Sequence, residues 1–474
     1  MSDETGDKTI PLAWVWAVIP AALILGALGV TPLRSWDFWW HAAIGRLIDA
    51  TGGIPNENLF LYTMEADHPS FIQPWLSQWL LFRLEDGLGL NAVLLVRNLL
   101  AGMGWACLTW WAQRRGESWQ IGAVLALLAV PFGYLYIGAR THLFAWPLLL
   151  ACLGLCYAVR SGRLGRFWLL ALPAITAVWV NLHGSFVIPS LIALAFLADS
   201  VWQRFTGEVE VAHGFWAMAL VGALGATVAN PHGFDVWVYL VELSSNDVVR
   251  QTITEWMPVT LGRPVLLGPL FYGLLVAGAV VFGLGRRRFE AVDALLFFGF
   301  ALMAALHARS LLWFALVVPV TLAPCAAEVV RGWRGEPEDS DDERSAVSNV
   351  AHGAIIFAAV VGALALQPWT SNHELALTFR QDVRSRSPMA GLVPSETPVD
   401  AIWVLKARPS DQLRLFHDHR SPGYFIYELQ DADPTQMVFV DNRVELPSAA
   451  LWSDFEQVSK AEGWRESFRE YDVN

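Results

Sequence analysis

Long apolar runs alternate with short polar connections along almost the whole chain. Runs of about 20 residues are long enough to cross a ~30 Å hydrocarbon core as helices. Hydropathy predicts eleven such runs, over residues 11–31, 88–112, 119–138, 142–159, 167–181, 185–203, 215–230, 265–285, 291–306, 310–328 and 349–367. The pattern therefore predicts an all-α polytopic membrane bundle.

The composition supports this class. Hydrophobic residues make up 55% of the 474 residues and charged residues only 16%, whereas a soluble globular domain carries about 25% charged residues. The first apolar run follows an acidic start and has no A-x-A cleavage site, so it is interpreted as a retained span and not a signal peptide. The net charge of −12 argues against nucleic acid as a partner.

Basic residues predict the orientation of the bundle. Arginine clusters occur at every second boundary between apolar runs, at 113–116, 160–166, 203–205, 285–288 and 331–335. The positive-inside rule places these boundaries and the N-terminus in the cytoplasm. Residues 1–367 then form a transmembrane domain in the cytoplasmic (inner) membrane, and residues 368–474 form an extracytoplasmic domain. The acidic stretch 336–343 is predicted to be a cytoplasmic linker.

The first outer loop, residues 32–87, contains two helical patterns. Residues 38–50 have apolar positions at helical spacing and are followed by Gly52, Gly53 and Pro55, which stop a helix. Residues 74–84 are apolar but too few to span the bilayer. Both segments are predicted to be helices lying in the membrane interface.

The extracytoplasmic C-terminal domain has mixed periodicity. Three strand-like runs cover 412–418, 423–429 and 437–443, and a helical pattern covers 450–464. The sequence predicts a small α/β domain. Within it, Asp441 and Arg443 are expected to form an internal ion pair, and the cluster His417, Asp418 and His419 is interpreted as a surface group in preference to a metal site.

Polar side chains gather at the predicted outer ends of the spans. Five outer connections carry Asp37, His41, Arg140, His142, His183, Asn230, His232, His307 and Arg309. An ionisable group at membrane depth costs about 2.5–3.5 kcal/mol on insertion scales, so such groups are usually paired or functional. Their recurrence on one face predicts a site there. Asn230 and His232, in a Pro/Gly turn, are interpreted as structural, whereas His183 remains open between a turn cap and a ligand.

Asp37 and Arg97 have alternative interpretations. Asp37 directly precedes the helix predicted over 38–50, so it is either an N-cap or a catalytic carboxylate. His41 lies one helical turn further on. Arg97 lies inside the second span, where it is expected to pair with a carboxylate or a lipid phosphate. A catalytic interpretation demands a cavity that holds Asp37 together with at least one of Arg140 and Arg309.

The order of these motifs resembles that of a known family. "DFWWHAAIGRLI" (37–48), "GGIP" (52–55) and "PWLSQWLL" (74–81) follow a first span. Further stretches are "RTHLFAW" (140–146), "WVNLHGSF" (179–186), "NPHGFDVW" (230–237), "ITEWMP" (253–258), "HARSLLWF" (307–314), "GYFIYEL" (423–429) and "VFVDNRVE" (438–445). Together they resemble the GT-C superfamily of membrane glycosyltransferases, in particular the bacterial branch similar to protein mannosyltransferases and aminoarabinose transferases. Compared with that family, the C-terminal domain is expected to be truncated.

The resemblance implies transfer of a sugar from a polyprenyl-phosphate carrier to a glycan, lipid or protein acceptor at the outer face, with inversion. It assigns Asp37 as the general base. A carboxylate at a partly dry interface is expected to have a raised proton affinity, which suits a base working near neutral pH. Cationic donors are needed for the departing lipid phosphate. The candidates are His41, Arg97, Arg140, His142, His183, His307 and Arg309.

A divalent metal ion and two other functions stay open at this point. Glu65 and Asp67 have a spacing that can hold a divalent cation, as in oligosaccharyltransferase-like members, and no other cofactor is expected. The alternative function is a non-catalytic subunit or scaffold of a membrane protein complex in the envelope. A transporter is disfavoured, because the polar residues lie at one face and not at the midplane.

The predicted topology can be tested with reporter fusions. A reporter that is active only outside the cytoplasm should be active when fused after Asn474. The same reporter inserted within 336–343 should be inactive, because the arginine clusters place that loop inside. The reverse pattern would contradict every outer-face assignment above.

Overall fold

A computed structural model describes residues 12–206, 213–335, 349–367, 392–407, 413–430 and 435–474. The chain divides into two compact units. The first unit comprises Met1–Val30, Asn98–Ile137 and Pro258–Asn372, and the second comprises Thr31–Arg97, Gly138–Met257 and His373–Asn474. The acidic stretch 336–343 lies outside the described residues.

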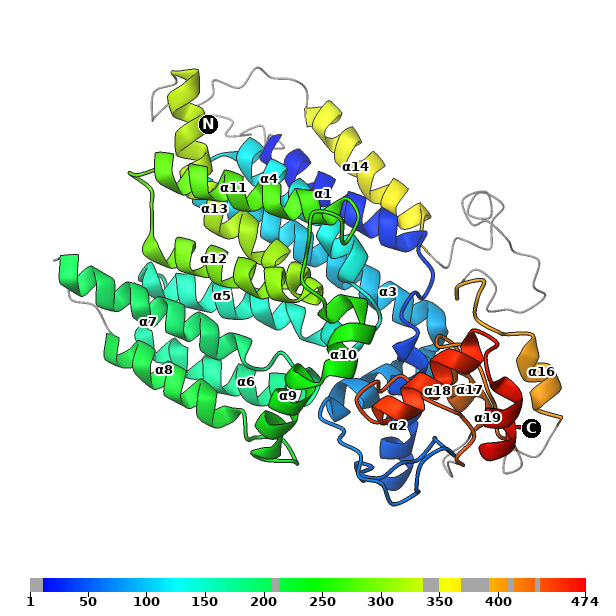
Figure 1. The fold of residues 1–474 in the computed structure, drawn as a ribbon. Coiled ribbons are helices and arrows are strands. Elements are labelled where there is room, and N and C mark those ends of the chain that lie inside the picture. The colour runs from blue at the N-terminus through cyan, green and yellow to red at the C-terminus, as the bar shows by residue number, and fades with distance from the viewer. Residues whose placement is uncertain (1–11, 207–212, 336–348, 368–391, 408–412, 431–434) are drawn as a thin grey trace. The chain divides into compact units, whose positions relative to one another are not determined.

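The first unit is built around helix α13 (Figure 1). Its helices are α1 (Leu12–Gly29), α4 (Trp119–Tyr136), α11 (Leu267–Leu284), α12 (Ala291–Leu306), α13 (Leu311–Arg334) and α14 (Asn349–Ala365), with the short η4 (Ala308–Ser310) and the second part of α3 (Trp75–Gly116). Helix α13 packs against α4, α11 and α12, while α1 packs against α4 and α14. The most apolar stretch of α13 is entirely buried, so it forms the core of this unit.

The second unit contains the remaining helices. They are α2 (Asp37–Thr51), the first part of α3, η1 (Thr141–Phe144), α5 (Trp146–Arg160), η2 (Arg166–Leu170), α6 (Ala171–Leu182), α7 (Ile188–Thr206), α8 (His213–Ala226), α9 (Asp235–Ser245), α10 (Asp247–Thr252), η3 (Thr254–Trp256), α16 (Ala401–Leu405), α17 (Pro422–Leu429), α18 (Ala449–Ser459) and α19 (Trp464–Glu470). Helices α6 and α7 pack against α8, and α5 packs against α7. Helix α17 lies against α2 (Figure 1).

A helix lies within each of the eleven apolar runs, which confirms a mostly helical membrane protein. In the described part of the chain, six helices are long and apolar enough to cross a bilayer: Leu12–Gly29, Trp75–Gly116, Trp119–Tyr136, Thr141–Arg160, Leu267–Leu284 and Ala308–Arg334. The number of eleven spans and the sidedness stay predictions.

Helix α3 joins a predicted interfacial helix to a predicted span. Gly89 has φ 77° and ψ 170°, a conformation that only glycine adopts readily, and it interrupts the helix between residues 75–88 and 90–116. The helix predicted over 74–84 is therefore present and is separated from the span by a single residue.

One element of the C-terminal segment differs from the prediction. Residues 423–429, predicted to be a strand, belong to helix α17. A short continuous apolar run fits a buried helix as well as a strand, and Pro422 at the first helical position decides for the helix. Leu415 and Val438, from the other two predicted strands, form only an isolated parallel bridge, and the described residues contain no longer ladder. The α/β class is thus not confirmed.

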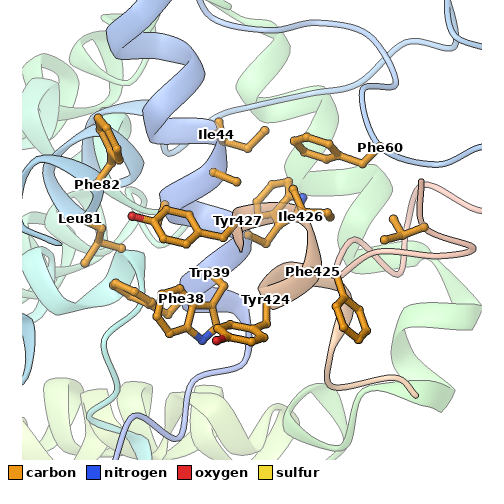
Figure 2. Packing of buried hydrophobic residues seen from close by; sticks show 14 of the residues in the cluster. Phe38, Trp39, Ile44, Phe60, Leu81, Phe82, Tyr424, Phe425, Ile426 and Tyr427 are labelled. Atoms are coloured by element: carbon orange, nitrogen blue, oxygen red, sulfur yellow. The ribbon is translucent and has the colours of Figure 1, made fainter. Parts of the chain in front are cut away.

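Aromatic side chains join α17 to α2 (Figure 2). Trp39 contacts Tyr424 and Tyr427, with ring centroids 5.1 Å apart in both pairs. Gly423 lets the two helices approach closely, because a Cβ there would lie 2.9 Å from the backbone nitrogen of Trp40. On another side of α2, a Cβ on Gly45 would collide with the Gln78 carbonyl of α3. Helix α2 is therefore fixed between α3 and α17.

Alanine substitutions at two helical glycines test this packing. Alanine normally stabilises a helix interior by up to about 1 kcal/mol relative to glycine. Gly45→Ala should instead lower the melting temperature, since its Cβ would also lie 2.7 Å from the Cβ of Phe82. Gly87→Ala is the matched control, because no heavy atom lies within 4 Å of its added Cβ. Equal melting temperatures for the two variants, measured in detergent, would contradict the close packing of α2 on α3.

Candidate active site

Asp37 is the first residue of α2 and does not act as its N-cap. The N-cap position is Trp36, which makes no side-chain cap hydrogen bond. The Asp37 carboxylate, 33% exposed, pairs instead with Arg140, with Oδ2 3.3 Å from the Arg140 Nε. Its Oδ1 accepts a hydrogen bond of 3.2 Å from the Nδ2 of Asn442. The cap interpretation is therefore wrong, and the expected proximity of Asp37 and Arg140 is observed.

Arg140 joins Asp37 to a second carboxylate. Its Nη1 donates to both carboxylate oxygens of Glu255, at 3.1 Å and 3.0 Å. Burial alone would lower the pKa of the Arg140 guanidinium, but the charges of Asp37 and Glu255 raise it above its usual value. One cation thus connects the start of α2, the segment before η1 and the short helix η3.

The backbone near Arg140 is positioned by small and polar residues. A Cβ on Gly138 would collide with the Ser35 hydroxyl, so glycine lets this segment approach the start of α2. The Ser77 hydroxyl of α3 donates to the carbonyls of Thr141 and Leu182, at 3.2 Å and 2.7 Å. Ser77 therefore holds the chain next to Arg140 and next to His183.

His41 lies one turn after Asp37 and is half-buried. The Gln78 amide donates to its Nδ1 at 3.2 Å. Burial lowers the pKa of His41 to about 4, against the raising effect of the Asp37 charge. The imidazole is therefore neutral at pH 7, and because Nδ1 accepts, its proton is on Nε2.

His142 and His183 lie side by side, with ring centroids 6.0 Å apart. The Nε2 of His142 accepts from the Gly138 backbone N–H at 3.4 Å. The Nδ1 of His183 lies 2.7 Å from the Ser185 hydroxyl. The structure thus brings two of the predicted phosphate-binding histidines together, next to the segment that carries Arg140.

The C-terminal segment contributes to this neighbourhood through Asn442 and its two neighbours. Asp441 and Arg443 form the expected internal ion pair, which is buried, with the Arg443 Nε 2.9 Å from Asp441 Oδ2. The Arg443 guanidinium also lies over the Trp40 ring, 5.2 Å from its centroid. Arg443 therefore joins this segment to α2, next to the contact of Asn442 with Asp37.

Asn230 and His232 make contacts that fit a structural role. The Asn230 amide donates to the carbonyls of Gln73 and Val180, both at the ends of neighbouring elements. The His232 Nε2 lies 3.1 Å from the Ile72 carbonyl oxygen. Both residues therefore fasten the connection between α8 and α9 to the segment that precedes α3.

The three remaining predicted binding residues are Arg97, His307 and Arg309. The Arg97 guanidinium is buried and donates to the carbonyls of Thr31 and Pro32. His307 and Arg309 belong to the first unit. His307 precedes η4, and Arg309 is part of η4, between α12 and α13. Their contribution to phosphate binding stays a prediction.

Solved structures with a similar fold include the archaeal oligosaccharyltransferase AglB from Archaeoglobus fulgidus. One such structure, in complex with an inhibitory peptide and a dolichol-phosphate, superposes with a TM-score of 0.55 at 13% sequence identity. It matches over 90% of this chain and 64% of the AglB chain. The chain therefore has a fold similar to that of AglB.

Two further structures of the Archaeoglobus fulgidus enzyme agree with this. The form tethered to an acceptor peptide with the NVT sequon gives a TM-score of 0.54 at 13% identity, over 91% of this chain and 64% of the other. The apo form gives a TM-score of 0.55 at 13% sequence identity, over 90% of this chain and 64% of the other. No protein-family model and no curated protein matches the sequence. The chain spans 64% of the length of these structures, which is less than two thirds.

The residues present do not fit the divalent metal ion that oligosaccharyltransferase-like members of the GT-C fold imply. Glu65 and Asp67, the predicted ligands, are both exposed. Across the described residues, no three His, Cys, Asp or Glu side chains are grouped closely enough to hold a metal ion. The interpretation of His417, Asp418 and His419 as a surface group is wrong for His417, which is buried with its Nδ1 2.8 Å from the Asp418 carbonyl oxygen; Asp418 and His419 are exposed.

Sequence reasoning did not single out Glu255, Asn442 or Gln78. Glu255 belongs to the stretch "ITEWMP" (253–258). A carboxylate in a predicted outer connection could have marked it as a candidate site residue. Asn442 and Gln78 gave none, because their importance comes from contacts with residues 405 and 37 positions away along the chain.

The pH dependence of stability follows from His41 and His417. Burial lowers the pKa of both side chains to about 4. Between about pH 6.5 and 4 the unfolded chain binds protons that the folded chain does not, so stability is complete above this range and is lost as the pH falls through it. His41→Gln and His417→Gln should each flatten the fall of the melting temperature in this range.

The matched control is His68→Gln at an exposed position. Melting curves in detergent at pH 4.5, 5.5, 6.5 and 7.5 provide the measurement. The explanation by buried neutral histidines fails if both variants retain the pH dependence of the parent protein.

Proposed function

We propose that the protein is a membrane glycosyltransferase that moves a sugar from a polyprenyl-phosphate carrier to an acceptor at the outer face of the membrane. The observation that supports this most is the convergence of Asp37, Arg140 and Glu255 from three separate connections. The fold likeness to AglB, whose structure is described as a complex with a dolichol-phosphate, supports a lipid-linked donor.

In the proposed reaction Asp37 is the general base. Its carboxylate takes the proton of the acceptor's nucleophilic group as that group forms a bond to the anomeric carbon of the sugar. The bond from the anomeric carbon to the phosphate oxygen breaks on the opposite side, so the configuration inverts. The electron pair of that bond leaves with the lipid phosphate.

The ion pair with Arg140 changes how Asp37 meets this role. A dry interface alone would favour the protonated carboxyl group, whereas a neighbouring guanidinium and an amide donor favour the carboxylate. A base has to be deprotonated before it can act. Arg140 therefore keeps the Asp37 carboxylate available as a base.

The departing phosphate needs hydrogen-bond donors. His41, neutral and carrying its proton on Nε2, is one candidate, and the adjacent His142 and His183 are two more. His307 and Arg309 remain candidates from the first unit. Arg140 already contacts two carboxylates, so we do not assign it to the phosphate in this reaction. The alternative function is a non-catalytic subunit or scaffold with this fold.

Asp37→Asn separates the enzyme from the scaffold. Loss of a general base lowers a rate by on the order of 10²–10⁴-fold, while asparagine retains the size of the side chain. The variant should insert and accumulate like the parent protein but fail to restore the glycan in a deletion strain. Polyprenyl-linked sugar should accumulate in that strain, and lipid extraction with mass spectrometry would identify it.

Asp49→Asn, on the same helix, is the matched control. Asp49 pairs with the exposed Arg83 at 3.4 Å, a surface contact that contributes little to stability. This control should restore the glycan fully. Full restoration by Asp37→Asn as well would reject the catalytic role and favour the scaffold.

A further inference from the structure

All four carboxylate oxygens of Asp37 and Glu255 have a hydrogen-bond or ion-pair partner. Asp37 Oδ2 lies 3.3 Å from the Arg140 Nε, and Asp37 Oδ1 accepts from Asn442 at 3.2 Å. Glu255 Oε1 and Oε2 lie 3.1 Å and 3.0 Å from the Arg140 Nη1. The two carboxylates are therefore held by nitrogen donors throughout.

Two carboxylates brought to one place repel each other unless a cation lies between them. A divalent metal ion would need oxygen atoms at about 2.0–2.6 Å and several of them at once. Here three of the four oxygens face the Arg140 guanidinium at 3.0, 3.1 and 3.3 Å, and the fourth faces the Asn442 amide at 3.2 Å. The described residues also offer no cluster of three metal-binding side chains.

We propose that Arg140 is the built-in cation of this site and replaces a divalent metal ion between Asp37 and Glu255. The role of Asp37 in a reaction rests on the proposed function, whereas the position of Arg140 between the two carboxylates does not. The guanidinium fork suits this position, because its donors lie in one plane and can address two carboxylates at fixed directions. Arg140 comes from the segment just before η1, which Gly138 and Ser77 hold in place.

The replacement has chemical consequences. A guanidinium stays protonated at every pH that the folded protein tolerates, and no chelator removes it. With one positive and two negative charges, the group keeps a net charge of about −1, whereas a divalent ion would bring the same carboxylates to neutrality. Asp37 in this site is therefore a carboxylate with a hydrogen-bonded counter-ion, not a metal ligand.

Mn²⁺ binding to the full-length protein tests the proposal without any transfer assay. Electron paramagnetic resonance of Mn²⁺ titrated into purified protein in detergent reports the free ion. Any Mn²⁺ binding by the wild-type protein should be unchanged by Asp37→Asn. Its melting temperature should be the same in millimolar Mn²⁺ and in EDTA. Arg140→Gln should bind Mn²⁺ at least tenfold more tightly than wild type, because it leaves two carboxylates without their cation.

The double variant Arg140→Gln/Glu255→Gln is the control for folding and for the site. It removes the repulsion between the carboxylates, so it should melt higher than Arg140→Gln alone, and it should lose the gained Mn²⁺ affinity. One Mn²⁺ per wild-type chain that Asp37→Asn abolishes would overturn the proposal. So would an Arg140→Gln protein with no gain in Mn²⁺ affinity.

Transfer activity provides an independent comparison. If Asp37-dependent transfer is found, EDTA should leave it unchanged, and a loss that Mg²⁺ reverses would overturn the proposal. If no transfer is found with any polyprenyl donor, the proposed function fails. The Mn²⁺ and melting results still decide whether Arg140 is the cation of the site.

Discussion

The packing of α2 between two neighbours is the constraint on which the candidate site depends. Gly45 brings α2 against the backbone of α3, and Gly423 brings α17 against Trp40. Neither contact has room for a larger side chain without movement, since protein interiors are close-packed. Because Asp37 and His41 lie on the first turns of α2, this packing fixes the direction in which both side chains point.

The C-terminal segment is part of the same arrangement. Buried aromatic residues of α17 cover α2, and Asn442, between the paired Asp441 and Arg443, donates a hydrogen bond to Asp37. A buried ion pair contributes little net stability, but removal of one partner is strongly destabilising, because the other charge is left without compensation. The hydrophobic contact between α17 and α2 supplies the stability.

The helices were predictable because length and hydropathy determine them. An apolar run near 20 residues becomes a helix in a membrane whatever its neighbours are, and a helix occupies every run that hydropathy selected. The strand predicted at 423–429 was wrong, because local apolarity does not distinguish a buried helix from a strand. Proximity of Asp37 to Arg140 was predictable from the gathering of charged residues on one face. The pairing of Arg140 with Glu255, and the arrival of Asn442, depend on tertiary contacts across more than 100 positions.

Charge accounts for how the donors at this site divide their roles. Arg140 is shared by Asp37 and Glu255, which leaves a net negative group that includes the proposed base. An anionic lipid phosphate would be repelled by that group at close range, so it needs hydrogen-bond donors other than Arg140. Neutral imidazoles suit this role, because they donate a hydrogen bond to an anion and do not compete with Arg140 for the carboxylates. Burial keeps His41 in that neutral form, and the Gln78 amide directs its remaining proton to Nε2. In the proposed reaction the guanidinium would serve the base, and His41 would be a donor to the leaving group.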